Sequence, residues 1–132
     1  MIVKKKIVTI IGLGLIGSSI LRAFSYYLKK IFYIKVYDNN SEHLKVVKSF
    51  NIADEICNSA EESVKESDLV ILAIPVGSMA KVGKLISPYL KKGAILTDTG
   101  STKLSVIKDL SLLIPKNVFF VPSHPLAGTE HS

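Results

Sequence analysis

The chain has 132 residues, 48% of them hydrophobic and 21% charged, which is the size and composition of one globular domain. Its formal net charge of +6 comes from lysines spread along the chain and a single arginine. A nucleic-acid-binding protein would cluster this charge and interleave it with arginines and aromatic residues, so nucleic acid is not an expected partner. The one cysteine, Cys57, excludes an internal disulfide and fits a reducing compartment.

The opening residues, MIVKKK followed by an apolar run, have the pattern of a secretory signal. Glycines interrupt that run, no A-x-A cleavage site follows it, and it is too short to span a bilayer. We therefore expect a soluble, cytoplasmic protein that does not bind membranes.

In the first half of the chain, short apolar runs alternate with segments of helical periodicity, which predicts strands separated by helices. Ser41 is the predicted N-cap of the second helix, and Ser59 that of the third. The predicted strands cover residues 6–11, 33–37 and 54–56, and the predicted helices cover residues 15–28, 41–48 and 60–65.

The second half continues the same alternation, with Pro75 and Pro115 marking the ends of a strand and a helix. Its predicted strands cover residues 68–74, 94–97 and 118–121, and its predicted helices cover residues 78–90 and 103–113. Six strands joined by crossover helices predict an α/β fold with a parallel sheet covered on both faces. Right-handed crossovers favour a Rossmann-type, doubly wound sheet with strand order 3-2-1-4-5-6.

A glycine-rich loop, Gly12-x-Gly14-x-x-Gly17, lies between the first strand and the first helix. In a dinucleotide-binding loop the first glycine permits the tight turn, the second lets the backbone approach a pyrophosphate, and the third lets the helix pack on the strand. The amino end of the helix then offers N–H groups to the phosphates. The spacing predicts a dinucleotide site.

Asp38 ends the second predicted strand, at the distance from the glycines where dinucleotide-binding proteins place an acid for the adenine ribose. Its charge would repel a 2′-phosphate, and it is followed by Asn39 and Asn40, not by an arginine. We therefore expect NAD to be preferred over NADP. Asp38 can also cap the turn before the next helix.

Three further loops follow strands four, five and six: AIPVGSM, DTGSTK and SHPLAGTE. Because parallel sheets bind ligands at the carboxyl ends of their strands, these loops should share a rim with the glycine loop. His124 is a candidate general base on this rim, although a histidine there can equally serve to hydrogen-bond a turn. His43 and His131 are expected to be surface residues. The predicted cofactor-binding residues are Gly12, Gly14, Leu15, Ile16, Gly17, Asp38, Ile74, Pro75 and Ser101; no metal site is expected.

Taken together, five pieces of the sequence resemble the prephenate/arogenate dehydrogenase family: IIGLGLIGSS, VYD, LAIPVG, DTGSTK and HPLAGTE, in that order. The first piece is common to dinucleotide-binding proteins, whereas DTGSTK followed by HPLAGTE is far more particular. The resemblance covers essentially the whole chain and implies an NAD(P)-binding domain over residues 1–132.

The resemblance implies an oxidoreductase of tyrosine biosynthesis that oxidises prephenate, or arogenate, with loss of CO2 and aromatisation of the ring. His124 matches the family's histidine, which takes the proton from the ring hydroxyl while hydride leaves the same carbon. Ser101 matches a serine that hydrogen-bonds this hydroxyl and orients the histidine. Glu130 matches a glutamate near the side-chain end of the substrate.

The resemblance also implies a helical C-terminal domain that dimerises and supplies an arginine for a substrate carboxylate, and we do not expect that domain within these 132 residues. Arg22 lies on the first predicted helix, where we expect it to face away from the rim, and Lys103 offers only a point charge. We therefore expect a cofactor-binding half that ends after its last catalytic loop. It should bind dinucleotide, show little or no dehydrogenase activity alone, and tend to self-associate, whereas the full-length enzyme should be a homodimer.

Two other interpretations remain open at the level of sequence. One is a dehydrogenase that acts on arogenate or another hydroxy acid through a similar cofactor-binding half. The other is a dinucleotide-binding module without catalytic function.

Overall fold

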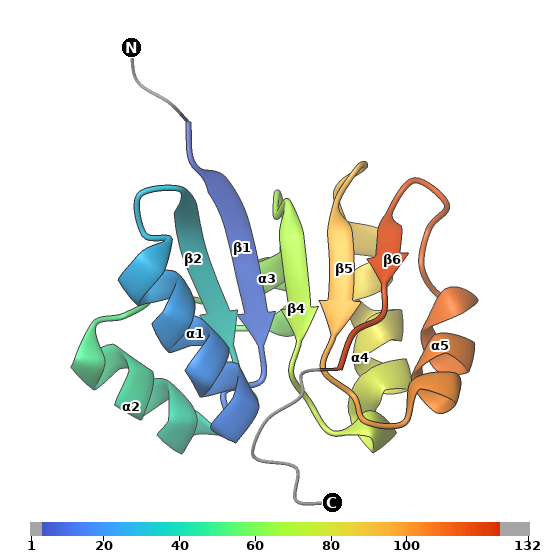
Figure 1. The fold of residues 1–132 in the computed structure, drawn as a ribbon, viewed down its shortest axis with the longest axis horizontal. Helices are drawn as coiled ribbons and strands as arrows, with labels where there is room; N and C mark the ends of the chain where they lie inside the picture. The colour runs from blue at the N-terminus through green and yellow to red at the C-terminus, as the bar shows by residue number, and fades with distance from the viewer. Residues whose placement is uncertain (1–3, 125–132) are drawn as a thin grey trace, which may run out of the picture.

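Six parallel strands form one sheet in the order β3-β2-β1-β4-β5-β6 (Figure 1), as the sequence predicts. The computed structural model describes residues 4–124. The strands are β1 (Lys6–Ile11), β2 (Phe32–Tyr37), β3 (Glu55–Ile56), β4 (Leu69–Leu72), β5 (Ile95–Asp98) and β6 (Phe119–Val121). All of them run in the same direction, so their carboxyl ends meet at one edge of the sheet.

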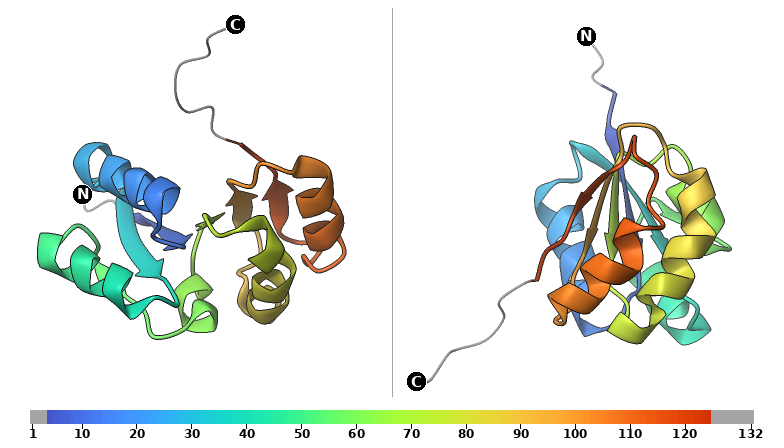
Figure 2. Two further views of the ribbon diagram at one scale, coloured as in Figure 1. Left: turned by 90° about the horizontal axis from the view of Figure 1, so that it is seen from below. Right: turned by 90° about the vertical axis from the view of Figure 1, so that its right-hand side faces the viewer.

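Helices cover both faces of the sheet, which Figure 2 shows from below and from the side. The α1 and α2 helices lie against the half formed by β1, β2 and β3, and the remaining helices lie on the opposite face. The helices are α1 (Leu15–Tyr27), α2 (Ser41–Phe50), α3 (Ala60–Val64), α4 (Met79–Ile86) and α5 (Lys103–Ser111), with 3-10 turns η1 (Val76–Ser78) and η2 (Ser87–Tyr89) flanking α4.

The central strands are apolar on both sides because each face has its own core. On β1, Val8 and Ile10 pack with α1 and α2, whereas Ile11 belongs to the core under α3, α4 and α5. The fully buried side chains include Leu21 for the first core and Leu96 for the second. This two-sided burial explains why the β1 sequence, KIVTII, is apolar on both faces apart from its first residue and the buried Thr9, rather than strictly alternating.

Several element boundaries differ from those predicted. The N-cap of α2 is Asn40 rather than Ser41, because the Asn40 side chain accepts a hydrogen bond from the N–H of Glu42 at 2.9 Å. The predicted helix over residues 78–90 ends at Ile86, and the chain continues as a 3-10 turn that contains Pro88. The Ser59 cap of α3 is confirmed.

One part of the sheet has no helix over it among the described residues. On the face that α1 and α2 occupy, the side chains of Ile95, Phe119 and Val121 are 42%, 63% and 51% exposed. Within residues 4–124, no helix is long and apolar enough to cross a membrane.

Candidate cofactor cleft and catalytic rim

The glycine loop has the geometry that a dinucleotide-binding turn requires. Gly12 leaves β1 with φ of +98°, and a Cβ there would overlap the backbone of Ala73, the residue that follows β4. A Cβ on Gly17 would overlap the carbonyl oxygen of Gly12, so α1 packs against the turn only because residue 17 is glycine. Gly14, by contrast, faces open space with nothing within 4 Å of a Cβ placed there.

The amino end of α1 is available to an anion. Gly14 is its N-cap, no side chain caps its N–H groups, and its first turn holds no acidic residue. No side chain of this first turn therefore neutralises the partial positive charge of the helix end. Open backbone at Gly14 beside this helix end fits the pyrophosphate of a dinucleotide.

A cleft of about 500 Å³ opens at the carboxyl ends of β1, β2 and β4. Five of the predicted cofactor-binding residues line it: Gly12, Gly14, Asp38, Ile74 and Pro75. Val82 and Leu85 of α4 add an apolar wall. This combination of an apolar wall with a few polar groups is typical of small-molecule sites.

Asp38 is buried at the end of β2, and its carboxylate is held by three hydrogen bonds. Oδ2 accepts from the N–H of Leu13 at 2.7 Å and from Nδ1 of His43 at 2.8 Å, and Oδ1 accepts from the N–H of Asn40 at 2.8 Å. Burial by itself would raise the pKa of Asp38, but the bonds from His43, Asn40 and Leu13 together hold the pKa below its ordinary value. The group is therefore a carboxylate at neutral pH.

Among the cleft residues that were not foreseen from the sequence are His43 and Lys81. His43, expected to be a surface residue, is half-buried in the first turn of α2, bonds Asp38 and lines the cleft. Lys81 lines the cleft from α4. The sequence feature that could have indicated His43 is its position in the first turn of the helix that follows Asp38. For Lys81 the corresponding feature is its helical spacing with Val82 and Leu85.

The remaining predicted cofactor residues lie around the cleft rather than in its lining. Gly17 is buried beneath the turn, and Leu15 and Ile16 are exposed on the first turn of α1. Ser101 is exposed in the loop between β5 and α5.

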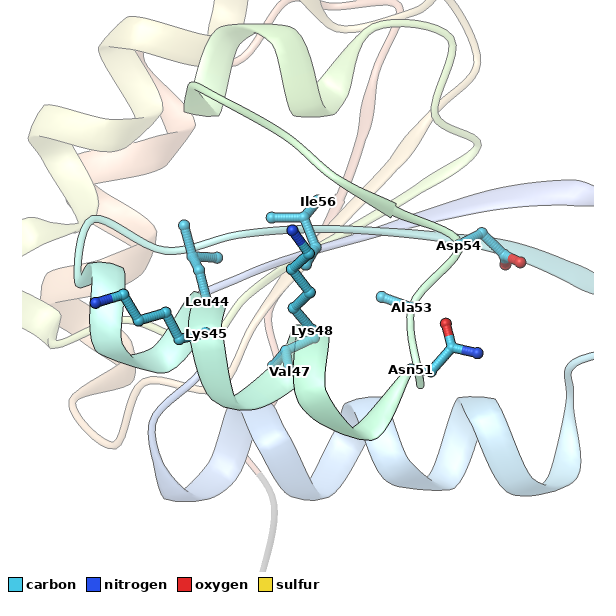
Figure 3. A pocket seen from close by; sticks show the side chains of 8 residues that line it. All are labelled: Leu44, Lys45, Val47, Lys48, Asn51, Ala53, Asp54 and Ile56. Carbon is cyan, nitrogen blue, oxygen red and sulfur yellow. The ribbon is translucent and has the colours of Figure 1, made fainter.

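A second pocket, of about 400 Å³, lies between α2 and the segment that leads into β3 (Figure 3). It is lined by Leu44, Lys45, Val47, Lys48, Asn51, Ala53, Asp54 and Ile56. None of the glycine-loop residues borders it, so it is separate from the cofactor cleft. Nearby, burial and a hydrogen bond to Glu55 raise the pKa of Cys57 to about 12, which keeps this residue a thiol rather than a nucleophile.

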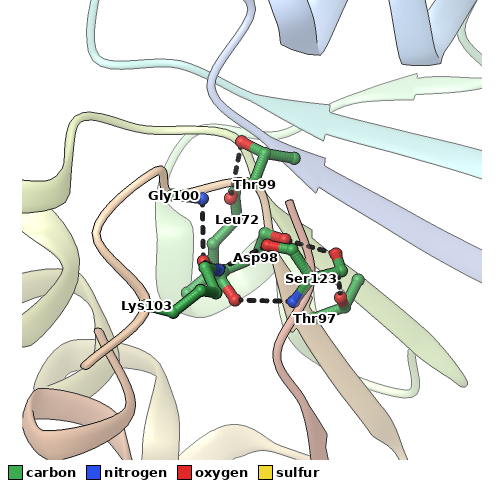
Figure 4. A network of polar contacts seen from close by, with 7 residues as sticks. All are labelled: Leu72, Thr97, Asp98, Thr99, Gly100, Lys103 and Ser123. Atoms are coloured by element: carbon green, nitrogen blue, oxygen red, sulfur yellow. Dashed lines mark hydrogen bonds and ion pairs between the residues drawn. The ribbon is translucent and has the colours of Figure 1, made fainter. Parts of the chain in front are cut away.

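A polar network joins the loops after β5 and β6 (Figure 4). Asp98, fully buried at the end of β5, accepts hydrogen bonds from the N–H of Gly100 at 2.8 Å and of Ser123 at 3.2 Å. The Ser123 hydroxyl donates to the carbonyl of Asp98 at 2.6 Å. Lys103 completes the network by pairing with the Asp98 carboxylate and donating to the carbonyl of Ser123.

This network fixes the neighbours of two of the three predicted catalytic residues, Ser101 and His124. Ser101 lies between Gly100 and Lys103, and His124, which is exposed, directly follows Ser123. The ammonium group of Lys103, which was expected to offer only a point charge to a substrate carboxylate, faces Asp98. Glu130 lies outside the described residues, as does His131.

Arg22 lies on α1 with its guanidinium 5.9 Å from the ring centre of Phe50 on α2. This places it against α2, away from the loops after β5 and β6. Among residues 4–124, no group of three or more His, Cys, Asp or Glu side chains could hold a metal ion.

Comparison with known proteins identifies relatives over nearly the whole chain. The family described as prephenate dehydrogenase, nucleotide-binding domain, matches residues 24–132. The cyclohexadienyl dehydrogenase of Zymomonas mobilis is 42% identical over 96% of this chain and 43% of its own length. The prephenate dehydrogenase of Bacillus subtilis is 31% identical over 97% of this chain and 34% of its own length. The chain thus spans less than half the length of these relatives.

Solved structures agree in fold. The prephenate dehydrogenase of A. aeolicus, in complex with hydroxyphenyl propionate and NAD+, superposes with a TM-score of 0.80 at 31% identity, over 98% of this chain and 44% of that one. The arogenate dehydrogenase of Synechocystis, at 23% identity, shares the fold with a TM-score of 0.78. The chain belongs to the prephenate dehydrogenase family, and the part of that family it matches is the nucleotide-binding domain.

Proposed function

We propose that this chain is the cofactor-binding part of an NAD-dependent prephenate dehydrogenase, which converts prephenate to 4-hydroxyphenylpyruvate in tyrosine biosynthesis. The observation that carries the proposal is the cleft itself, where the glycine loop, the free helix end and Asp38 lie together. The similarity to a family member whose structure was solved with NAD+ supports it.

In this proposal Asp38 selects NAD over NADP. Its carboxylate accepts hydrogen bonds from the adenine-ribose hydroxyls and repels a 2′-phosphate. Gly14 and the first turn of α1, with Leu15 and Ile16, hold the pyrophosphate, and Ile74 and Pro75 form the wall toward the nicotinamide.

Bound NAD supplies an acceptor for the hydride that leaves the ring carbon of the substrate. His124 takes the proton of the hydroxyl on that carbon, so that no unstabilised cation has to persist. A positioned general base of this kind contributes roughly a hundredfold to ten-thousandfold in rate. Ser101 hydrogen-bonds the same hydroxyl, and Glu130, near the side-chain end of the substrate, helps to position other binding groups.

A second candidate substrate is arogenate. It is favoured by the 42% identity to a protein named for cyclohexadienyl substrates in general, since prephenate and arogenate are both cyclohexadienyl acids. A full-length protein assayed with both compounds separates the two. We further propose that the full-length enzyme is a cytoplasmic homodimer and that the 132 residues alone do not turn prephenate over.

Calorimetric titration of the chain with NAD+ tests the cofactor site directly. We expect saturable binding by the wild-type chain and its loss in Gly14→Val. In a full-length enzyme, His124→Ala should lower kcat at least a hundredfold and leave the affinity for NAD+ unchanged. A chain that binds no NAD+, or a His124→Ala enzyme of normal activity, would contradict the proposal.

A further inference from the structure

We infer that His43 is a specificity-determining residue of the cofactor cleft: its contact with Asp38 sets the charge shown to the ribose 2′ position and thereby how strongly NADP is rejected. This inference rests on the proposed function and adds to it a residue on α2 that the glycine-loop pattern does not include.

The geometry assigns the proton in this contact. Asp38 is a carboxylate and can only accept hydrogen bonds, so Nδ1 of His43, at 2.8 Å from Oδ2, must carry a hydrogen and donate it. In the neutral ring Nε2 is then the acceptor, and in the protonated ring both nitrogens donate. The His43 side chain is 41% exposed and that of Asp38 only 8%, so His43 can exchange protons with solvent while Asp38 stays buried.

Other charged groups surround the pair. Glu61 of α3 and Lys81 of α4 line the same cleft, and neither forms an ion pair among the described residues. On the same helix as His43, Glu42 pairs with Lys45 at 3.3 Å, with both side chains more than 70% exposed. The group in direct contact with His43 is therefore the Asp38 carboxylate.

The two forms of His43 present different surfaces to a dinucleotide. With a neutral ring, the Asp38–His43 pair carries one negative charge, which repels a 2′-phosphate. With a protonated ring, the pair carries no net charge, and the opposite charges of Glu61 and Lys81 in the cleft lining offset each other. Histidine is the side chain that ordinarily changes charge between about pH 5 and 8. Discrimination against NADP should therefore weaken as the pH falls.

The test is the ratio of the dissociation constants for NADPH and NADH, measured by fluorescence at about pH 6 and about pH 8. Three proteins are compared: wild type, His43→Gln and Lys45→Gln. Glutamine can still donate to Asp38 but cannot become charged. Lys45→Gln removes an exposed positive charge from the same helix outside the cleft, and serves as the matched control. The 2′-phosphate itself titrates near pH 6, but this contributes equally in all three proteins.

We expect the ratio to fall about tenfold between pH 8 and pH 6 in wild type and Lys45→Gln, beyond the change seen in His43→Gln. An equal change in all three proteins overturns the inference while leaving NAD binding, and so the proposed function, intact. A wild-type chain that binds neither dinucleotide overturns both. The thermal midpoint of His43→Gln, measured alongside, is expected to match wild type because the residue is half-exposed.

Discussion

Gly14 and Gly17 are three residues apart, but they restrict side chains for different reasons. At Gly17 the obstacle is the protein itself, since a Cβ there would overlap the carbonyl oxygen of Gly12. At Gly14 a side chain meets open space, which the proposed pyrophosphate would occupy. Stability therefore depends on Gly17, and ligand binding on Gly14.

Exchanging each glycine separates these effects. Gly17→Ala should lower the free energy of unfolding by about 3 kcal/mol, because backbone cannot move aside as a flexible side chain can. Gly14→Ala should change that free energy by less than about 0.5 kcal/mol and weaken NAD+ binding. Urea denaturation and calorimetric titration measure the two quantities. Loss of stability in Gly14→Ala would show that this glycine is structural.

Asp38→Asn tests the role of the carboxylate charge in cofactor choice. The amide keeps the size of the side chain but loses the charge and half of its acceptor capacity. Charge-assisted hydrogen bonds contribute about 1.5 to 3 kcal/mol, so the dissociation constant for NAD+ should rise at least tenfold. The dissociation constant for NADP+ should rise less than that for NAD+, or fall. Competition binding with both cofactors measures this, and an unchanged ratio would remove Asp38 from cofactor selection.

At the scale of single residues, the role of a residue in the site could be predicted from the sequence where a motif fixes its spacing. The three glycines and Asp38 follow such a pattern, and five of the nine predicted cofactor residues line the cleft. His43 could not be found in this way, since helical periodicity does not show that the amino end of α2 turns toward Asp38. The pairing of Lys103 with Asp98 could not be predicted either, because Asp98 becomes buried only when β5 pairs with its neighbours in the folded sheet.

At the scale of elements, the Asp98 network connects the end of β5, the start of α5 and the end of β6. Lys103→Met should lower the free energy of unfolding by about 3 kcal/mol, because it leaves a buried carboxylate without its cation. The double variant Asp98→Asn/Lys103→Met should be more stable than the sum of the single changes predicts. A double-mutant cycle in urea measures the coupling. Strict additivity would mean that the pair does not hold the loops together.

At the other end of the sheet, where the strands begin, Asp68 holds neighbouring segments together. Its Oδ2 accepts from the N–H of Ile7 at 2.8 Å, and its Oδ1 accepts from Nζ of Lys91 at 2.7 Å, so it connects the starts of β1 and β4 to the loop before β5. Burial favours a higher pKa for Asp68, but the bonds from Lys91 and Ile7 lower it below the ordinary value. A carboxyl whose pKa is lower in the folded state stabilises the fold above its unfolded pKa, near 3.8, and loses this effect as the pH falls through the folded pKa.

Asp68→Asn should therefore cost about 1 kcal/mol at neutral pH and make the decline of stability below about pH 4 less steep. Thermal midpoints of both proteins between about pH 2 and 7 measure the difference. Parallel curves at every pH would show that Asp68 has the same pKa in the folded and unfolded states.

The strand order was predictable because crossover handedness and the glycine loop leave few topologies. The boundaries of the helices and strands were less predictable, because they depend on individual hydrogen bonds. The N-cap of α2 is Asn40 and not the predicted Ser41, because it is the Asn40 side chain that accepts a hydrogen bond from the free N–H of Glu42.

At the scale of the whole molecule, the part of the sheet that no helix within residues 4–124 covers is a continuous apolar surface. Ile95 pairs with Phe119 across β5 and β6, and Thr97 pairs with Val121, so the exposed side chains lie next to one another on one face. The β6 strand is also the edge of the sheet. Contiguous apolar surface beside the last strand of a sheet favours association, whereas single exposed apolar residues do not.

The chain should accordingly self-associate at high concentration, and Phe119→Lys/Val121→Lys should reduce this association because two charges on the face resist desolvation. Leu112→Lys provides the control: Leu112 is 90% exposed at the end of α5, outside the apolar face, and its replacement should leave association unchanged. Sedimentation velocity over a range of concentrations measures the effect. Equal association in all three proteins would assign it to another surface, and a wild-type chain that stays monomeric would show that the exposed face is too small to drive it.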